Sequence, residues 1–183
     1  MKINIIVAFS KNRGIGINNT LPWNISSDLK KFKNLTIGDN NNAVIMGKNT
    51  WDSIPIKYLS HRDNLILSSK LILDVKYENK NNSYDIVKSF TTIDNLLDFC
   101  NNKKYDIVWI IGGSQIYNLF MENKNICIDE IYVTYIDSDF KCDTFFPKID
   151  VNDYSNVTQK KHSLNDSSIK YDVYDRIYKY KSK

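Results

Sequence analysis

Asp28 is the residue whose type and position most suggest chemistry. It opens a short amphipathic segment in the stretch GINNTLPWNISSDLKKF (residues 16–32), in which Leu29 and Phe32 follow it. A helix that begins near Ser27 would place Asp28 and Phe32 on one apolar face. A partly buried carboxylate there could pair with a flat heterocycle that carries an amidine-like pair of N–H groups. On position alone, a simpler alternative ranks first: an acid in the first turn of a helix complements the helix dipole.

Two glycine-containing segments predict a site for phosphate groups. AVIMGKNTW passes from a predicted strand to a predicted helix at Gly47, and VWIIGGSQIY does so at Gly112 and Gly113. Unpaired N–H groups at a helix start attract anions, and glycine lets a phosphate approach the backbone closely. One such segment alone is most simply a turn. Two of them at the carboxyl edge of one sheet, with Lys48 beside the first, favour a dinucleotide site.

The GIG sequence at Gly14–Gly16 does not complete a dinucleotide fingerprint. Asn19 stands where a third small residue is needed, and no helix is predicted to start there. Gly14, Gly16, Asn18 and Asn19 adopt positive φ more readily than most residues. The segment therefore predicts an irregular loop after the first strand, which is either a plain turn or a lid over a cofactor.

The elements that must position these residues alternate along the chain. Stretches rich in Ile, Val and Tyr predict strands at residues 3–9, 43–46, 64–68, 84–88, 106–111, 129–136, 154–159 and 169–179. Helical spacing predicts helices at residues 27–35, after a Ser26 or Ser27 cap, and at 48–53, 92–101 and 114–121. Alternation up to about residue 121 indicates parallel strands, and the strand-rich tail indicates antiparallel edge strands. Residues 70–83 are predicted to be an irregular insertion, and residues 79–83 an Asn-rich surface loop.

Composition predicts a single domain, residues 1–183, because 42% of the residues are hydrophobic and can form one sizeable core. The net charge of +4 arises from 25 basic and 21 acidic residues that are interleaved, so no arm that grips nucleic acid is predicted. The three cysteines form no Cys-x-x-Cys pair, and neither histidine lies beside a cysteine. No metal site is therefore expected, and a reducing cytoplasm suits the thiols. The apolar run INIIVAF is too short for a membrane span.

Several long motifs, in order along nearly the whole chain, resemble the dihydrofolate reductase family. They are IVAFSKNRGIGINNTLPW (residues 6–23), the acid Asp28, VIMGKNTWDSIP (44–55), NLILSS (64–69), VWIIGGSQIY (108–117) and YVTYIDSDFKCDTFFPKID (132–150). Such a series is far more specific than any single short pattern. With the predicted elements, it implies an α/β fold with a mostly parallel eight-stranded sheet, an antiparallel C-terminal strand and helices on both faces.

The resemblance also implies a reaction. NADPH would deliver a hydride to C6 of 7,8-dihydrofolate while N5 gains a proton, giving 5,6,7,8-tetrahydrofolate for one-carbon metabolism and thymidylate synthesis. Asp28 would be the carboxylate that holds the pterin ring and supports protonation at N5. Trp23 would help to hold an ordered water near Asp28. Thr134 would bind Asp28 or, through a water, the pterin amino group.

Carried over residue by residue, the family pattern places two sets of binding residues. Besides Asp28 and Thr134, the substrate pocket would be lined by Ile6, Val7, Leu29, Phe32, Ile54, Leu59 and Ile111. The cofactor groove would be formed by Ala8, Gly14, Ile15, Gly16, Gly47, Lys48, Asn49, Thr50, Leu67, Ser68, Ser69, Lys70, Gly112, Gly113, Ser114, Gln115, Ile116 and Tyr117. In the family, the peptide bond between the paired glycines is cis.

Arg62 corresponds to the family's arginine for the α-carboxylate of the substrate. Only three of the 25 basic residues are arginines, and a planar guanidinium can grip a carboxylate through two hydrogen bonds. Without the resemblance, an exposed surface charge is the simpler interpretation.

At the 2′-phosphate of NADPH the sequence departs from the family. Ser69 follows Ser68 at the position where many members have a basic residue, and the basic residue comes one position later, at Lys70. Lys48 and these three residues are expected around that phosphate.

Dihydrofolate and NADPH are thus the expected partners, without nucleic acid or membrane. The chain is expected to act as a monomer or as part of a larger fusion with thymidylate synthase. Two other functions compete: a related reductase for a pyrimidine or another pterin, and a binding protein that keeps the pocket without turnover. Asp28 and Arg62 together argue against the first, because a substrate without a glutamate tail does not need Arg62. Intact Asp28, Trp23 and Gly112-Gly113 argue against the second.

Overall fold

The structure, a computed structural model, describes residues 1–79, 83–164 and 168–181. Its helices are α1 (Ser26–Ile37), α2 (Lys48–Ser53), α3 (Ile93–Lys103) and α4 (Ser114–Glu122). Its strands are β1 (Lys2–Ser10), β2 (Gly14–Gly16), β3 (Asn42–Gly47), β4 (Asp63–Leu67), β5 (Asp74–Glu78), β6 (Tyr84–Phe90), β7 (Ile107–Gly112), β8 (Glu130–Ile136), β9 (Thr144–Phe145), β10 (Tyr154–Lys161) and β11 (Val173–Tyr180). Every predicted helix and strand is present, with ends shifted by a few residues.

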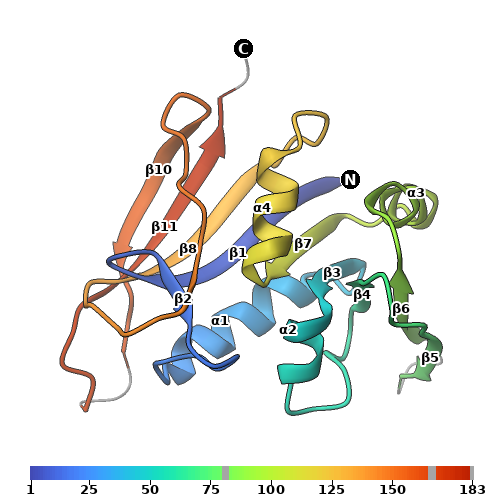
Figure 1. Cartoon of the computed structure of the whole chain (residues 1–183), viewed down its shortest axis with the longest axis horizontal. Coiled ribbons are helices and arrows are strands. Elements are labelled where there is room, and N and C mark those ends of the chain that lie inside the picture. The colour runs from blue at the N-terminus through green and yellow to red at the C-terminus, as the bar shows by residue number, and fades with distance from the viewer. Residues whose placement is uncertain (80–82, 165–167, 182–183) are drawn as a thin grey trace.

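Within the described residues, the main sheet has nine strands in the order β10-β11-β8-β1-β7-β3-β4-β6-β5. The inner pairs, from β8–β1 to β4–β6, are parallel. The pairs β10–β11, β11–β8 and β5–β6 are antiparallel. The predicted α/β fold with a mostly parallel sheet is therefore confirmed, and both edges of the sheet are antiparallel (Figure 1).

The prediction of an eight-stranded sheet is wrong by one strand. β5 lies in the segment that was expected to be irregular, and it forms a continuous antiparallel ladder with β6. Most of its side chains are exposed, so no apolar alternation marks it in the sequence. Backbone hydrogen bonding to the neighbouring strand makes it a strand. The predicted Asn-rich loop at 79–83 falls partly on residues 80–82, which lie outside the described residues.

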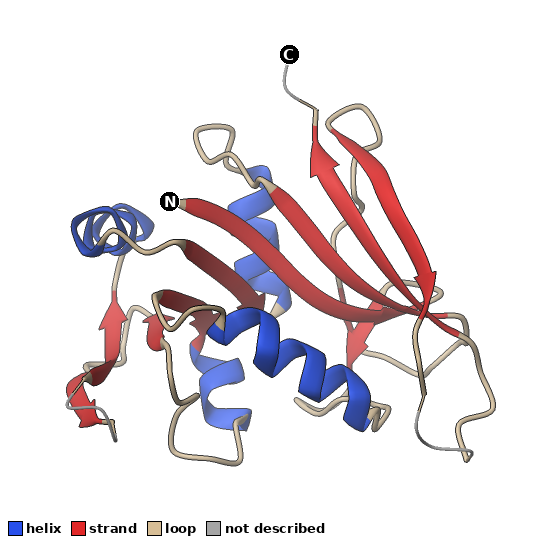
Figure 2. Ribbon diagram, turned by 180° about the vertical axis from the view of Figure 1, so that it is seen from behind, coloured by secondary structure: helices blue, strands red, loops and turns tan. Residues whose placement is uncertain are grey.

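Successive residues of β1 belong to opposite cores. Ile5 and Val7 lie in a cluster with Phe120 of α4, whereas Ile6 lies in a cluster against which Phe32 of α1 packs. α4 covers one face of the sheet, and α1 covers the other, as the two opposite views show (Figures 1 and 2). A parallel sheet that is covered on both faces needs strands that are apolar on both sides, which explains the nearly continuous runs of Ile and Val.

α1 begins earlier than the sequence predicts. Ile25 is the N-cap, no side chain caps the helix, and the backbone N–H groups of Asp28 and Leu29 donate to the Ile25 carbonyl. The predicted cap by Ser26 or Ser27 is therefore wrong. The Ser27 hydroxyl instead lies 2.9 Å from Nε2 of a histidine that follows β10.

Three parallel strands end at one edge of the sheet and determine where a site forms. β1 runs into the segment that contains β2, β3 runs directly into α2, and β7 runs into α4. These strands are neighbours in the order β1-β7-β3. In open α/β sheets, ligands bind at the carboxyl ends of such strands.

Candidate active site

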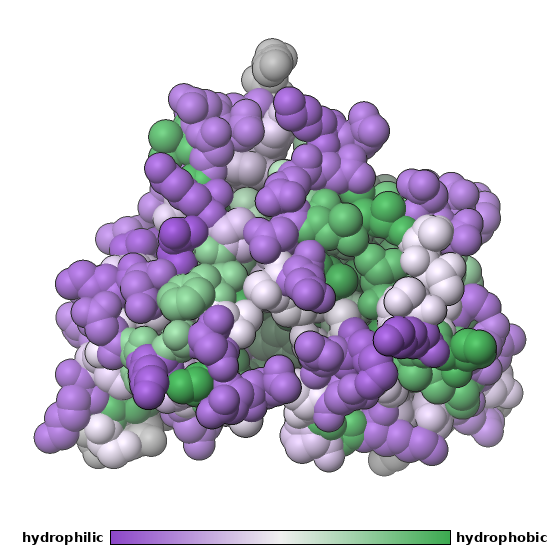
Figure 3. Space-filling model, in the orientation of Figure 1, coloured by the Kyte–Doolittle hydropathy of each residue, from purple (hydrophilic) through white to green (hydrophobic). Residues whose placement is uncertain are grey.

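A cavity of about 930 Å³ opens at this edge of the sheet. Its walls come from the segment between β1 and α1, from α1, from α2 and the loop after it, and from the start of α4. The space-filling view shows the face hollowed near its middle, between hydrophilic rims (Figure 3). Of the predicted site residues, all line the cavity except Gly14, Arg62, Lys70, Gly112 and Thr134.

Asp28 lies in the first turn of α1, and its side chain, 15% exposed, reaches into the cavity wall. The Thr134 hydroxyl, on β8, donates a hydrogen bond of 2.5 Å to Asp28 Oδ1. Lys31 Nζ lies 3.8 Å from the same oxygen. The structure thus brings Asp28 and Thr134 together directly across the junction of α1 and the sheet. This hydrogen bond gives Asp28 a partner outside its own helix, in addition to any interaction with the helix dipole.

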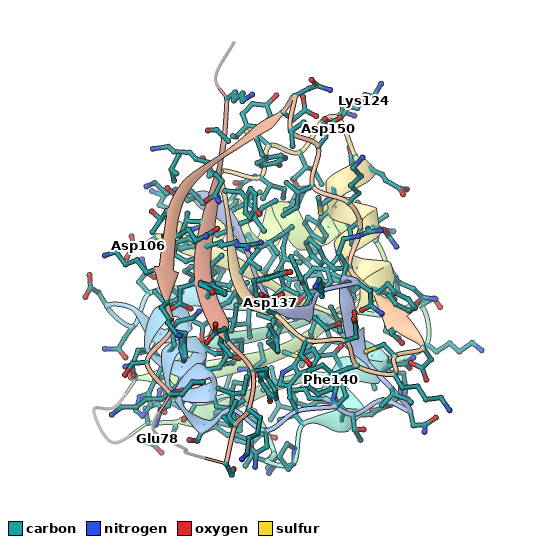
Figure 4. All side chains as sticks on the ribbon, turned by 90° about the vertical axis from the view of Figure 1, so that its left-hand side faces the viewer. Glu78, Asp106, Lys124, Asp137, Phe140 and Asp150 are labelled. Atoms are coloured by element: carbon teal, nitrogen blue, oxygen red, sulfur yellow. The ribbon has the colours of Figure 1, made fainter. Side chains whose placement is uncertain are left out.

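Trp23 forms part of the cavity wall next to α1 and is almost completely buried. Its ring packs edge-on against the ring of Phe140, with 5.3 Å between the ring centroids. Phe140 lies beyond Asp137 in the loop that follows β8 (Figure 4). Its indole N–H is buried and has no acceptor among the described residues. A buried donor without a protein partner is well suited to bind a water molecule.

Arg62 is a buried cation, with 4% of its surface exposed. Its guanidinium donates to the Ser60 carbonyl and to the Thr36 hydroxyl, and lies 5.9 Å from the ring centroid of Phe32. Burial lowers the pKa of Arg62 to about 10, against an opposing effect of Asp85, so the group stays charged at neutral pH.

The alternative of an exposed surface charge is therefore wrong for Arg62. Within the described residues, no carboxylate lies within 4.0 Å of the guanidinium. A charge that is removed from water normally has an opposite charge as its partner. The loop that carries Arg62 is held by the Asn64 side chain, which forms hydrogen bonds with the backbone of Leu59 and of Arg62 itself.

The glycines at the ends of β3 and β7 lie in close contact with α4. The Gly112–Gly113 peptide is cis, as the resemblance implies. Gly112 has φ of +112°, and a Cβ there would lie 3.1 Å from the Tyr117 ring. A Cβ on Gly47 would lie 3.0 Å from Ile116. A side chain at either position would collide with α4, so both strands need a glycine where they pack against this helix, and Gly47 and Gly113 bring their backbone to the cavity wall.

Tyr117 holds the first turn of α4 against β1. Its hydroxyl donates a hydrogen bond of 2.9 Å to the Ile6 carbonyl. Burial raises the pKa of Tyr117 far above its usual range, so the hydroxyl remains a donor. The start of α4 and the cavity-lining part of β1 are therefore joined by a hydrogen bond.

The residues expected around a 2′-phosphate are only partly preorganised. Lys48 lines the cavity, but its ammonium pairs with Asp52 one turn along α2. The Ser68 hydroxyl accepts from the backbone N–H groups of Lys70 and Leu71 and so shapes the turn after β4. Ser68 and Ser69 line the cavity, whereas the exposed Lys70 does not.

The segment after β1 forms a small sheet of its own. β2 pairs with β9, and Asp143 accepts a hydrogen bond of 2.8 Å from the Asn18 N–H. This bond, together with one from the Thr144 hydroxyl, holds the pKa of Asp143 below its usual range. The positive φ angles occur at Arg13, Asn18 and Asn19 and not at the two glycines for which the sequence favoured them.

Gly14 has a different structural role from the one expected. A Cβ there would lie 2.4 Å from Cys142 Sγ, so a glycine is needed for close packing between β2 and the segment before β9. Gly14 is buried and does not reach the cavity.

Sequence reasoning missed several residues that line the cavity, namely Asn19, Thr20, Leu21, Asn24, Ser53, Pro55 and Thr144. Five of these lie in or beside β2, β9 and the segment before α1, where irregular backbone has no periodic signal.

Within the described part of the chain, no group of three or more His, Cys, Asp or Glu side chains is arranged to hold a metal ion.

Comparison with known proteins agrees with this geometry. A family model described as dihydrofolate reductase matches residues 2–179. A dihydrofolate reductase of Heliothis virescens is 34% identical over 189 aligned residues, which cover 98% of this chain and 97% of the relative. The chain belongs to the dihydrofolate reductase family. The predicted family and the predicted reductase activity are thereby confirmed.

Two further relatives of this dihydrofolate reductase chain bear on its fold and length. A solved structure of a dihydrofolate reductase from Enterococcus faecalis, complexed with NADP(H), has a TM-score of 0.78 at 25% identity and covers 99% of this chain and 97% of that one. A bifunctional dihydrofolate reductase-thymidylate synthase of Arabidopsis thaliana is 38% identical over 82% of this chain, which is 27% of the relative. Among the described residues, no helix is long and apolar enough to cross a membrane.

Proposed function

We propose that the cavity binds 7,8-dihydrofolate with its pterin ring against Asp28, and binds NADPH along the glycine-rich wall formed after β3 and β7. The observation that carries this proposal is the largely buried Asp28 carboxylate, held by Thr134, in the wall of a cavity that Gly47 and Gly113 also line. NADPH, when bound, supplies the hydride that reduces C6. The chain's own residues bind and orient the two partners and promote protonation at N5.

Asp28 is the group that favours a protonated pterin. The ring of the substrate carries a 2-amino group beside a ring N–H, and this pair matches the two oxygens of one carboxylate. Negative charge next to the ring stabilises the positive charge that develops when N5 gains its proton. The Trp23 indole N–H supports a water beside Asp28, which provides a route for that proton.

Arg62 binds the α-carboxylate of the glutamate tail. It is the buried cation without an anionic partner in the described residues, and it lies beside Phe32, whose ring lines the cavity. Ile54 and Leu59 line the cavity, and the Asn64 side chain links the backbone of Leu59 to that of Arg62, so these two apolar side chains suit the aminobenzoyl ring. A substrate that lacks a carboxylate tail would leave the guanidinium unpaired.

Lys48 contacts the 2′-phosphate of NADPH by exchanging its exposed partner Asp52 for the phosphate. The Lys48–Asp52 pair is solvent-exposed on both sides, so replacing it has a small energetic cost. Ser68 and Ser69 supply further donors at the same wall, and the exposed Lys70 adds positive charge beside it.

For the whole protein, we propose that residues 1–183 form one domain that acts as a monomer in the cytoplasm. The alternative is a chain that is joined to thymidylate synthase, as in the bifunctional Arabidopsis relative. The mass of the native protein, isolated from the cell that makes it, distinguishes a free monomer from a fused chain.

NADPH oxidation, followed by its absorbance, tests the reaction itself. We expect oxidation to require 7,8-dihydrofolate and to be much slower with a dihydropterin that lacks the glutamate tail.

The same assay tests the choice of cofactor. We expect kcat/KM to be higher with NADPH than with NADH by roughly tenfold or more, because charge-assisted contacts to the phosphate are worth about 1.5–3 kcal/mol. Equal use of the two cofactors would contradict the assignment of Lys48.

The substitution Asp28→Asn should slow turnover without unfolding the protein. Asn keeps the shape and a hydrogen bond to Thr134 but loses the charge, so kcat near neutral pH should fall roughly 10²–10⁴-fold. The loss should shrink as pH falls, because solvent then supplies the N5 proton more readily. Near-normal kcat together with a lowered melting temperature would show that Asp28 is only a helix-dipole partner, worth about 0.3–1 kcal/mol.

The substitution Arg62→Leu should raise KM for dihydrofolate and leave KM for NADPH unchanged. Arg62→Lys is the matched control, since it keeps the charge and loses the planar fork. We expect Arg62→Lys to fall between the wild type and Arg62→Leu, because one of two hydrogen bonds to the carboxylate survives. A wild-type KM in Arg62→Leu would exclude the carboxylate role.

A further inference from the structure

Lys31 connects Asp28 to a charged network that sequence reasoning did not find. It follows Asp28 by three positions on α1, and its Nζ lies 3.8 Å from Asp28 Oδ1. The same ammonium donates to Thr134 Oγ1 at 2.5 Å and to Asp175 Oδ1. Thr134 and Asp175 are paired in register on β8 and β11, so their side chains project side by side toward α1.

Both oxygens of Asp175 are held. Oδ1 accepts from Lys31, and Oδ2 lies 2.9 Å from Nδ1 of His162, whose Nε2 lies 2.9 Å from the Ser27 hydroxyl. The His162 side chain is 6% exposed, so this support is shielded from water. Burial alone would raise the pKa of Asp175, but the hydrogen bonds from Lys31 and His162 outweigh it and lower the pKa. Asp175 is therefore a carboxylate at neutral pH.

The Lys31 contact fixes the Thr134 oxygen as an acceptor and holds it in place. An ammonium has three donors and no acceptor, so Lys31 must donate to the Thr134 oxygen. The single hydroxyl proton of Thr134 is then available for Asp28, to which it donates at 2.5 Å. Without the ammonium, the Thr134 oxygen would lose a donor that holds it in place, and the Asp28 carboxylate, which can only accept, would have to orient the hydroxyl without that support.

The Asp175 contact decides how close Lys31 comes to Asp28. The ammonium is in direct contact with Asp175 and stands 3.8 Å from Asp28, although Asp28 is the nearer residue in sequence. If the Asp175 charge were absent, the ammonium would move toward the remaining carboxylate, because an unpaired, half-buried cation is costly. A closer Lys31–Asp28 pair would occupy the carboxylate that the pterin needs.

We infer that Lys31 is a positioning residue for Asp28, and that Asp175, supported by His162, keeps Lys31 directed at Thr134 instead of at Asp28. In this arrangement Lys31 orients the Thr134 hydroxyl, and Asp175 leaves the Asp28 carboxylate free for substrate. The inference rests on the proposed role of Asp28 in binding the pterin.

The substitution Asp175→Asn tests the second half of this inference. It should raise KM for dihydrofolate about three- to tenfold, the usual size of coupling between contacting residues, and leave KM for NADPH unchanged. The double variant Asp175→Asn with Lys31→Met should return KM for dihydrofolate toward the wild-type value, because the competing ammonium is gone. If the double variant is as impaired as Asp175→Asn, the competition between Lys31 and substrate does not exist, and the inference fails.

The substitution Lys31→Met tests the first half by itself and does not depend on how well Asp175→Asn folds. Met keeps the long apolar stem without the ammonium, so kcat should fall about three- to tenfold with little change in KM for dihydrofolate. Lys31→Arg, which still donates to Thr134, should retain most of kcat. An unchanged kcat in Lys31→Met would overturn the positioning role.

The matched control is Asp172→Asn, which removes an exposed ion pair with Lys161 next to β11. Neither constant should change in this control, and NADPH binding should be normal in all variants as a check of folding. The experiment also separates the two levels of the argument. An inactive wild type would contradict the proposed function, whereas an active wild type with normal constants in Asp175→Asn and Lys31→Met would contradict this inference alone.

Discussion

The hydrogen bond between Asp28 and Thr134 joins two parts of the chain that are 106 positions apart, and the active site depends on it. A carboxylate that is largely removed from water must have polar partners, or it will destabilise the fold or lose its charge. Here the hydrogen-bond partner comes from the sheet, while Lys31 of the same helix stands 3.8 Å from the acid. The first turn of α1 is thereby fixed on β8, and the side of Asp28 that faces the cavity is left for a ligand.

The other half of the site follows from the opposite requirement, namely that the ends of two strands carry no side chain. β3 and β7 are adjacent parallel strands, so Gly47 and Gly112 reach the same edge of the sheet. α2 and α4 start directly after them. The acid on one wall and the bare backbone on the other divide the cavity into a side that recognises a polar ring and a side that accepts a dinucleotide. Hydride transfer requires both ligands to meet between these walls.

Periodicity and turn chemistry predict most of the elements, since apolar alternation and helix-start glycines are local signals. The face shared by Asp28 and Phe32 is visible in the sequence for the same reason. The role of Thr134 is predicted only by the family motif, because no residue near it in the sequence indicates that its side chain meets α1. The pairing of Lys31 with Asp175 spans 144 positions, and it depends on the register of β8 with β11, which no local pattern encodes. β5 was missed because backbone pairing, and not burial, defines it.

The proposed function depends on a negative charge that Asp28 presents to the ring of the bound ligand. The most direct measurement is a pH titration, by ultraviolet absorbance, of a 2,4-diaminopyrimidine bound to the protein, compared with the same compound free in solution. An ion pair with Asp28 would keep the bound ring protonated at pH values where the free compound is neutral, and Asp28→Asn would abolish this difference. A bound ring that titrates as it does in free solution would contradict the account.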